Sequence, residues 1–302
     1  IGAGYHIQTM CPDRSYVILE GRESLGGTWD LFKYPGVRSD SDMHTLGFSF
    51  KPWTEAKSIA DGPSILKYLK QTVSQFGIDK HIRYGQLVTK AQWSTDDAQW
   101  TVTSTNKSTG ATNTYTCSFL FMCSGYYSYK KGHTPEFTGR ERFKGTIVHP
   151  QEWPTDLDYA GKRVVVIGSG ATAVTIVPSM ADKAAHVTML QRTPTYFAAG
   201  RNADSLADEL RKLYVDDAWI HEIMRRKVVR DRADLLERAQ AAPDKLKKLL
   251  IDGVKACLPE GFDVDRHFTP PYKPMLEAIE AQPLFSFSQR RGTLVGFLPD
   301  GS

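Results

Sequence analysis

The residues best suited to chemistry in this sequence form a glycine turn at Gly168–Ala173. They read G-x-G-x-x-A and directly follow the β-branched run Val164–Ile167. In such a turn the first glycine permits a tight bend, the second lets backbone amides approach a pyrophosphate, and the small last residue lets the helix pack on the strand. The helix start adds unpaired N–H groups and a partial positive charge. We therefore expect a dinucleotide phosphate site formed by Gly168, Ser169, Gly170, Ala171, Thr172, Ala173 and Val174.

The end of the next predicted strand, His186–Leu190, indicates which dinucleotide binds. It is followed by Gln191, Arg192 and Thr193. An acid here would hold a free ribose 2′-hydroxyl, whereas a guanidinium suits a 2′-phosphate and a threonine hydroxyl adds a donor. Arg192 and Thr193 therefore predict NADPH rather than NADH; the alternative is an ordinary surface arginine at a strand end.

A matching turn is expected at Gly2 and Gly4, with Glu20 as its ribose-binding acid. Its spacing is too short, because only 12 residues separate Gly4 from Tyr16, against 17 at the equivalent place in the later unit. A parallel crossover needs a helix long enough to return along the sheet. We therefore expect that residues following Gly4 have been lost, including the third glycine of the motif.

A fingerprint between the two turns resembles a known family. Phe143, Gly145, His149, Trp153 and Pro154 fit F-x-G-x-x-x-H-x-x-x-W-P, which is typical of Baeyer–Villiger and related class B flavin-dependent monooxygenases. The stretch 26–42 also resembles the family's segment beside the flavin. The residues of these segments are most similar to those of the ethionamide-activating type. The resemblance runs to about residue 274 and implies an enzyme that uses FAD and NADPH.

The resemblance also implies residues that bind the flavin. Glu20 would accept the ribose hydroxyls of FAD, and the backbone of Val88 would meet its adenine. A glycine-initiated turn would close over the flavin with Thr28, Trp29, Asp30 and Leu31, and a segment between flavin and nicotinamide would comprise Arg38, Ser39 and Asp40. Two other roles stay open: Trp29 as a core aromatic, and Asp40 as the N-cap of a helix over Met43–Leu46.

The implied reaction has two halves. NADPH reduces FAD, and the reduced flavin captures O₂ as a C4a-peroxide that the protein must shield from water. As an anion, the peroxide attacks a ketone and gives an ester; when protonated, it oxygenates a soft sulfur or nitrogen. The expected partners are therefore O₂ and a small ketone or sulfur compound.

Three residues are candidates for catalytic roles: Arg38, Asp40 and His149. In the family, the aspartate matching Asp40 holds an arginine that stabilises the peroxide. That arginine follows a Tyr-x-Pro matching Tyr272–Pro274, but the arginine-bearing segment is absent here, and Arg38 is a poor substitute. His149 stands on the interdomain link, where we expect a positioning role in preference to direct chemistry.

Two sheets are needed to position these residues. The runs Ser15–Glu20 and Ser118–Cys123 predict strands of the first sheet, the second one buried. Between them, Trp93–Thr103 and Thr114–Cys117 predict an antiparallel excursion that turns at Asn106–Asn113. We expect an α/β fold of two Rossmann-like dinucleotide-binding domains, one for FAD and one for NADP, with a helical insertion in the second.

The domain order follows from these elements. Residues 1–142 are expected to form the first part of an FAD domain, 143–160 a linker with the fingerprint, 161–274 the NADP domain with its helical insertion, and 275–302 an incomplete return to the FAD domain. Between Arg211 and Lys255, twelve Lys/Arg exceed eight Asp/Glu. This surplus predicts a solvated helical face or, alternatively, weak association with an anionic membrane surface.

Composition excludes several protein classes. A chain of 302 residues with 41% hydrophobic and 24% charged residues is globular. No apolar run reaches the ~18 residues that a membrane span needs. A net charge of +4, without a zinc-finger or RNA-binding motif, argues against nucleic acid. The four cysteines contain no Cys-x-x-Cys, which favours a reducing, cytoplasmic setting, and we assign no metal ligands.

Three other functions stay open. A two-nucleotide disulfide reductase would need a redox cysteine pair, for which Cys117 and Cys123 are wrongly spaced. An N-hydroxylating flavoenzyme is a nearer relative, but would not need the fingerprint at 143–154. The non-enzyme alternative is a truncated chain that binds NADP(H) through the later glycine turn and cannot oxygenate.

Overall fold

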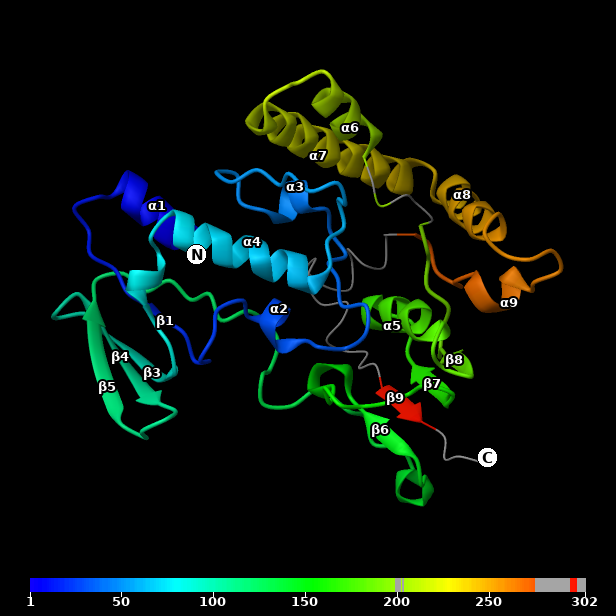
Figure 1. Ribbon diagram of the computed structural model, residues 1–302, viewed down its shortest axis with the longest axis horizontal. Helices are drawn as coiled ribbons and strands as arrows, with labels where there is room; N and C mark the ends of the chain where they lie inside the picture. The colour runs from blue at the N-terminus through cyan, green and yellow to red at the C-terminus, as the bar shows by residue number, and fades with distance from the viewer. Residues whose placement is uncertain (199–201, 203, 275–293, 298–302) are drawn as a thin grey trace. The chain divides into compact units, whose positions relative to one another are not determined.

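The computed structural model describes residues 1–198, 202, 204–274 and 294–297, and it divides into two compact units (Figure 1). The first unit combines Ile1–Leu31 with Gly62–Tyr127, and the second combines Phe32–Asp61 with Ser128–Ser302. The excursion Phe32–Asp61 therefore groups with Ser128–Ser302 and not with the segments on either side of it, Ile1–Leu31 and Gly62–Tyr127.

Helix α4 (Gly62–Gln75) organises the core of the first unit. Its buried residues Ile65, Tyr68 and Thr72 recur at three- and four-residue spacing, which places them on one face. Beyond the helix, the buried side chains of Ile78 and Ile82 pack together in one cluster. The flanking elements are short: α1 (Gly2–Met10), β1 (Ile18–Leu19), α2 (Thr28–Leu31), the 3-10 helix η1 (Asp79–His81) and β2 (Ile82–Arg83), which pairs with β1 in parallel.

The predicted antiparallel excursion is confirmed as a three-stranded sheet. Its strands are β3 (Gln86–Ser94), β4 (Gln99–Asn106) and β5 (Thr112–Cys117), in sequence order. The run predicted over Trp93–Thr103 is two strands, because the chain turns between them and Ala98 takes a positive φ of 50°. Trp93 and Trp100 then face each other across the ladder.

The prediction of a buried strand over Ser118–Cys123 is wrong. These residues form neither helix nor strand, and the side chains of Phe119 and Met122 are 77% and 76% exposed. An apolar run becomes a buried strand only when neighbouring strands satisfy its backbone. The parallel ladder of β1 and β2 is two residues long, and no strand among the described residues pairs with this run.

The second unit contains a four-stranded sheet with the order β6-β9-β7-β8. Strands β7 (Arg163–Ile167) and β8 (His186–Leu190) are parallel and joined by helix α5 (Ala171–Ala181), as predicted. Strand β9 (Leu294–Phe297) pairs antiparallel with β7 and with β6 (Thr146–Val148). Residues 275–302 are expected to return to the first domain. Of these, 275–293 and 298–302 lie outside the described residues, and strand β9 belongs to the sheet of the second unit.

Helices dominate the stretch after β8, in agreement with the helical pattern of the sequence. They are α6 (Ser205–Lys212), α7 (Asp217–Ala241), α8 (Pro243–Lys255) and α9 (Val264–Phe268). Side chains of Asp204, Asp216 and Asp263 accept amide hydrogen bonds at the starts of α6, α7 and α9. None of the helices in the described part of the chain has the length and apolarity to cross a bilayer. The remaining elements of this unit are α3 (Met43–Leu46) and the 3-10 helices η2 (Arg140–Arg142) and η3 (Pro150–Glu152).

Candidate functional site

The glycine turn between β7 and α5 has the geometry that the sequence predicts. Gly168 adopts a φ of 126°, which favours glycine, and its N–H donates to the carbonyl of Leu190 over 2.8 Å. Gly170 is the N-cap of α5, and a β-carbon built on it would meet no atom within 4 Å. The turn therefore leaves open space where a phosphate would approach the backbone.

The first turn of α5 supplies the groups that such a phosphate needs. Ala171 is exposed and Ala173 is fully buried, so the helix packs on the sheet through its small third residue. Val174 makes the first intrahelical bond, from its N–H to the Gly170 carbonyl over 3.0 Å. The amides before it point out of the helix end with a partial positive charge. These residues fit a dinucleotide pyrophosphate.

The loop after β8 carries the predicted cofactor-selecting residues. Arg192 is exposed, and the Ser169 hydroxyl donates to the Thr193 carbonyl over 3.3 Å, which joins this loop to the glycine turn. The Gln191 amide donates to the His267 carbonyl over 2.5 Å, and the Tyr272 hydroxyl donates to the Pro194 carbonyl over 3.2 Å. The structure therefore brings Arg192 and Thr193 into one unit with Gly168–Val174.

The expected turn at Gly2 and Gly4 is not formed, because both glycines lie in helix α1. Gly4 is buried, and a β-carbon on it would lie 3.2 Å from the Tyr16 hydroxyl. That space is filled by protein, so these glycines do not form a phosphate cradle here.

Other residues expected near FAD also lie in the first unit. Glu20 follows β1, as predicted, and one of its carboxylate oxygens accepts the Arg22 amide over 2.9 Å. Val88 is 44% exposed on β3. The four residues Thr28–Leu31 form helix α2, where Asp30 pairs with the Arg22 guanidinium over 2.8 Å and Trp29 is half-buried. In this chain the Asp30 carboxylate holds the turn together.

The segment Arg38–Asp40 lies in the second unit. The buried Ser39 hydroxyl donates to the Ser41 carbonyl over 2.6 Å and accepts the Ser41 amide over 2.9 Å. The backbones of Arg38 and Asp61 form an isolated antiparallel β-bridge, and both Arg38 and Asp40 reach solvent. Nevertheless, the surrounding protein raises the pKa of the Asp40 carboxyl by desolvation, and the Arg38 guanidinium opposes that shift. The helix N-cap expected as one role for Asp40 is Asp42 instead.

His149 stands at the start of η3. Its Nδ1 accepts the Gln151 amide over 3.1 Å, and its ring leaves no room for a β-carbon on Gly132. Burial lowers the pKa of the imidazole, with Glu152 raising it and His133 lowering it. A neutral Nδ1 that accepts a backbone hydrogen bond fits a positioning role.

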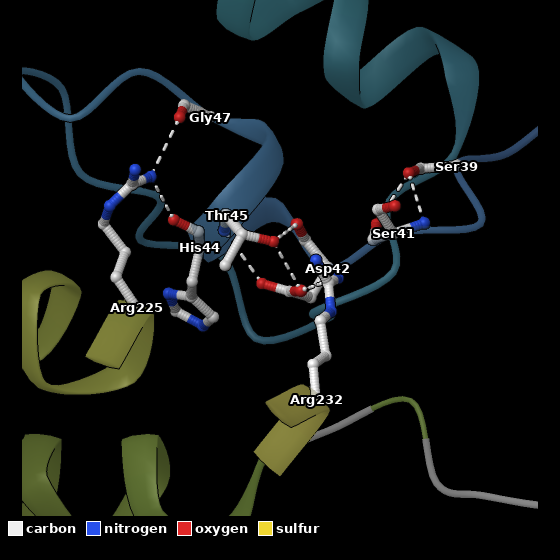
Figure 2. Close-up of polar contacts among 8 residues, drawn as sticks. All are labelled: Ser39, Ser41, Asp42, His44, Thr45, Gly47, Arg225 and Arg232. Atoms are coloured by element: carbon white, nitrogen blue, oxygen red, sulfur yellow. Dashed lines mark hydrogen bonds and ion pairs between the residues drawn. The ribbon is translucent and has the colours of Figure 1, made fainter. Parts of the chain in front are cut away.

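Three side-chain contacts were not predictable from the sequence, two to α3 and one to Ile59. Arg225 and Arg232 of α7 bind opposite ends of this helix (Figure 2), and Asn202 binds the backbone of Ile59. The residue pairs are separated by 143 to 190 positions. No local sequence pattern links residues that far apart. The one local indication was a helix N-cap, Ser41 and Asp42 before an apolar run.

Comparisons with known proteins agree with these features. A family model described as flavin-binding monooxygenase-like matches residues 48–206. The FAD-containing monooxygenase EthA of Mycobacterium tuberculosis (strain ATCC 25618 / H37Rv) is 50% identical over 275 residues, which cover 91% of this chain and 56% of EthA. The chain thus spans little more than half the length of this relative.

Two solved structures share the fold. Oxidised steroid monooxygenase bound to NADP has a TM-score of 0.68 at 25% identity, covering 88% of this chain and 57% of the other. OTEMO in complex with FAD and NADP has a TM-score of 0.58 at 28% identity, covering 80% and 43%. The relatives are therefore mixed helix and strand proteins with nucleotide-binding domains, and this chain matches part of them.

Proposed function

Because this chain belongs to the flavin-binding monooxygenase-like family, we propose that it is part of an FAD- and NADPH-dependent monooxygenase whose second unit binds NADPH. Of the relatives named above, EthA is FAD-containing and the steroid monooxygenase is bound to NADP. The proposal extends this chemistry to a chain that covers 56% of EthA.

One observation supports NADPH binding most strongly. The glycine turn at the start of α5 leaves space over Gly170, and the same unit carries an exposed Arg192 after β8. The first would accept the pyrophosphate and the second would pair with the 2′-phosphate. We further propose that the helices α6–α8 are an insertion in this NADP-binding domain, since they follow β8 and precede the Tyr272–Pro274 segment.

The overall reaction that we propose consumes NADPH and O₂. One oxygen atom would enter a ketone, giving an ester, or a thioether or thioamide, giving an S-oxide, and the other would leave as water. Bound FAD would supply the oxygen-activating chemistry in such an enzyme. In this chain Glu20 is available for its ribose, but Gly2 and Gly4 do not fit its pyrophosphate. We therefore derive no step through the flavin from these residues.

The same misfit favours a second candidate function. Gly2 and Gly4 lie in a helix while Gly168 and Gly170 form an open turn. A chain with one formed nucleotide cradle would bind NADP(H) without oxygenating a substrate. This alternative shares the NADPH site with the first proposal and differs only in the flavin.

The experiment that separates the two candidates measures binding and turnover in the same preparation. NADPH binding is followed by fluorescence, and NADPH oxidation is followed with added FAD, air and a panel of linear ketones, cyclic ketones and thioethers. Substrate-dependent oxidation with an oxygenated product supports the monooxygenase. Binding without such oxidation favours the NADP(H)-binding alternative, and absence of NADPH binding contradicts both.

A further inference from the structure

The arginine Arg225 of α7 binds the end of the short helix α3. Its guanidinium donates to the carbonyls of His44 and Gly47, over 2.7 and 3.2 Å (Figure 2). Carbonyls at the end of a helix lack intrahelical partners. One side chain therefore satisfies the acceptors that close α3, and it comes from a helix about 180 residues later in the sequence.

A second arginine of α7 binds the start of α3. The Arg232 guanidinium pairs with the Asp42 carboxylate over 2.9 Å, and the Asp42 side chain is 12% exposed. The same carboxylate accepts the Thr45 amide over 2.9 Å and the Thr45 hydroxyl over 2.7 Å. Arg232 thus stabilises the N-cap, so that α7 holds both ends of α3 (Figure 2).

The segment that carries Arg38–Asp40 is tied by hydrogen bonds to residues 58–61, and the Ser58 carbonyl there accepts the Met43 amide of α3 over 2.7 Å. The Ser39 amide donates to the Ala60 carbonyl over 2.9 Å, next to the backbone β-bridge between Arg38 and Asp61. Between Ser58 and Ala60, Ile59 exchanges two hydrogen bonds with the side-chain amide of Asn202, of 2.6 and 2.8 Å. Asn202 therefore fixes the strand-like stretch on which Arg38 and Ser39 rest.

The same segment lies directly on the helix of the glycine turn. Gly36 has a φ of 75°, and a β-carbon on it would lie 3.1 Å from the Thr175 carbonyl of α5. Two residues later the chain reaches Arg38. The Arg38–Asp40 segment is therefore connected to α5 through Gly36 and to α7 through α3, all within the second unit.

From these contacts we propose that Arg225, Arg232 and Asn202 are positioning residues that hold Arg38–Asp40 against the nicotinamide half of NADPH. This inference rests on the proposed function, because it takes α5 as the phosphate site and takes the place of Arg38–Asp40 beside the nicotinamide from the family resemblance. We call Arg225, Arg232 and Asn202 the clamp. Through them, α7 and Asn202 keep the excursion Phe32–Asp61 in place beside α5.

The test compares two ligands on the intact 302-residue chain. NADPH carries the nicotinamide, whereas 2′,5′-ADP carries only the adenosine half with the 2′-phosphate. Arg225→Met keeps the aliphatic stem and removes the donors, and Arg232→Met is a milder second variant because Arg232 is exposed. Arg226→Met is the matched control, since Arg226 binds Glu222 on α7 itself.

We expect Arg225→Met to lower the affinity for NADPH about tenfold, the scale of losing charge-assisted hydrogen bonds. Arg232→Met should lower this affinity less. Affinity for 2′,5′-ADP should stay unchanged in both, and Arg226→Met should match the wild type. Amide exchange of residues 38–47 and 58–61 should become faster in both clamp variants. Arg225→Lys should restore part of the NADPH affinity.

Three results overturn the clamp. Unchanged exchange at 38–47 in both variants shows that α7 does not hold the segment. An equal loss of both ligands shows a general effect on stability, and retained NADPH affinity shows that the clamp does not serve the nicotinamide. If the wild type binds neither ligand, the proposed function fails and the clamp's assignment to the nicotinamide fails with it, whereas the exchange rates still decide whether α7 holds the segment.

Discussion

Gly36 packs against Ser179 of helix α5 so closely that a β-carbon on Gly36 would lie 2.8 Å from that of Ser179. Gly36 also has a φ of 75°. Both features require glycine at this position, one by space and the other by backbone conformation. The contact joins the segment before Arg38 to the helix that begins at the glycine turn.

Replacing Gly36 by alanine should therefore destabilise the second unit. The left-handed backbone alone costs roughly 1–2 kcal/mol, and the clash with Ser179 adds to it. Chemical unfolding of Gly36→Ala, Ser179→Gly and the double variant measures the contact. We expect the double variant to lose less free energy than the sum of the two single losses, because Ser179→Gly removes the atoms that clash. Additive losses would show that the two residues do not touch.

The open space over Gly170 gives the opposite expectation for stability. Gly170 has an ordinary φ of −79°, and a β-carbon there meets nothing within 4 Å. Gly170→Ala should change the free energy of unfolding by less than about 1 kcal/mol. It should nevertheless lower the affinity for NADPH at least about tenfold, because the added methyl group lies where the pyrophosphate would approach the backbone. Calorimetric titration measures the affinity; unchanged binding would place the phosphates elsewhere.

Arg192 should decide which nicotinamide cofactor is preferred. Arg192→Ala should weaken NADPH by about ten- to a hundredfold, the range of a lost charge-assisted hydrogen bond, and leave NADH nearly unchanged. Binding of both cofactors is measured by fluorescence titration, with Arg226→Ala as the control for loss of an exposed arginine. Equal losses for NADPH and NADH would refute the assignment of Arg192 to the 2′-phosphate.

Two buried histidines should make the stability of the second unit depend on pH. His44 and His221 are 2% and 3% exposed, with ring centroids 6.3 Å apart. Desolvation lowers the pKa of both below the ordinary 6.5, and Arg211 acts on His44 and Arg225 on His221 in the same direction. Asp42, Asp204, Glu222 and the Phe48 backbone oppose these shifts.

The sign of the effect follows from the neutral folded form. Below about pH 6.5 the unfolded chain binds protons that the folded histidines do not, so the free energy of unfolding falls as the pH falls. Urea unfolding at pH 7.5 and 5.5 measures this. His221→Leu should flatten part of the slope. His44 and His149, whose pKa values are also lowered, account for a residual slope; a slope unchanged by His221→Leu would contradict the account.

Local patterns predicted the parts of the fold that depend on neighbouring residues. The unit β7–α5–β8 was predictable because a β-branched run, a glycine turn and a second apolar run lie within 28 residues. The helices α6–α8 were predictable from their charged, helical pattern. The candidate NADP site belongs to this part, since its residues all lie in or next to these elements.

Features that depend on distant partners were not predictable. Ser118–Cys123 reads as a buried strand, but burial requires partner strands that the short β1–β2 ladder does not offer. Gly2 and Gly4 read as a turn, but they lie in helix α1, where Gly4 is buried against Tyr16. The insertion of β9 between β6 and β7 joins strands far apart in the chain, and short-range patterns do not encode such pairing.

The central claim is that the start of α5 binds the phosphates of NADPH, and amide hydrogen exchange of the intact chain with and without NADPH tests it most directly. We predict slower exchange at residues 168–174, together with 191–193, and a weaker effect with NADH. Protection that is absent from 168–174, or that is confined to other parts of the chain, would contradict the claim.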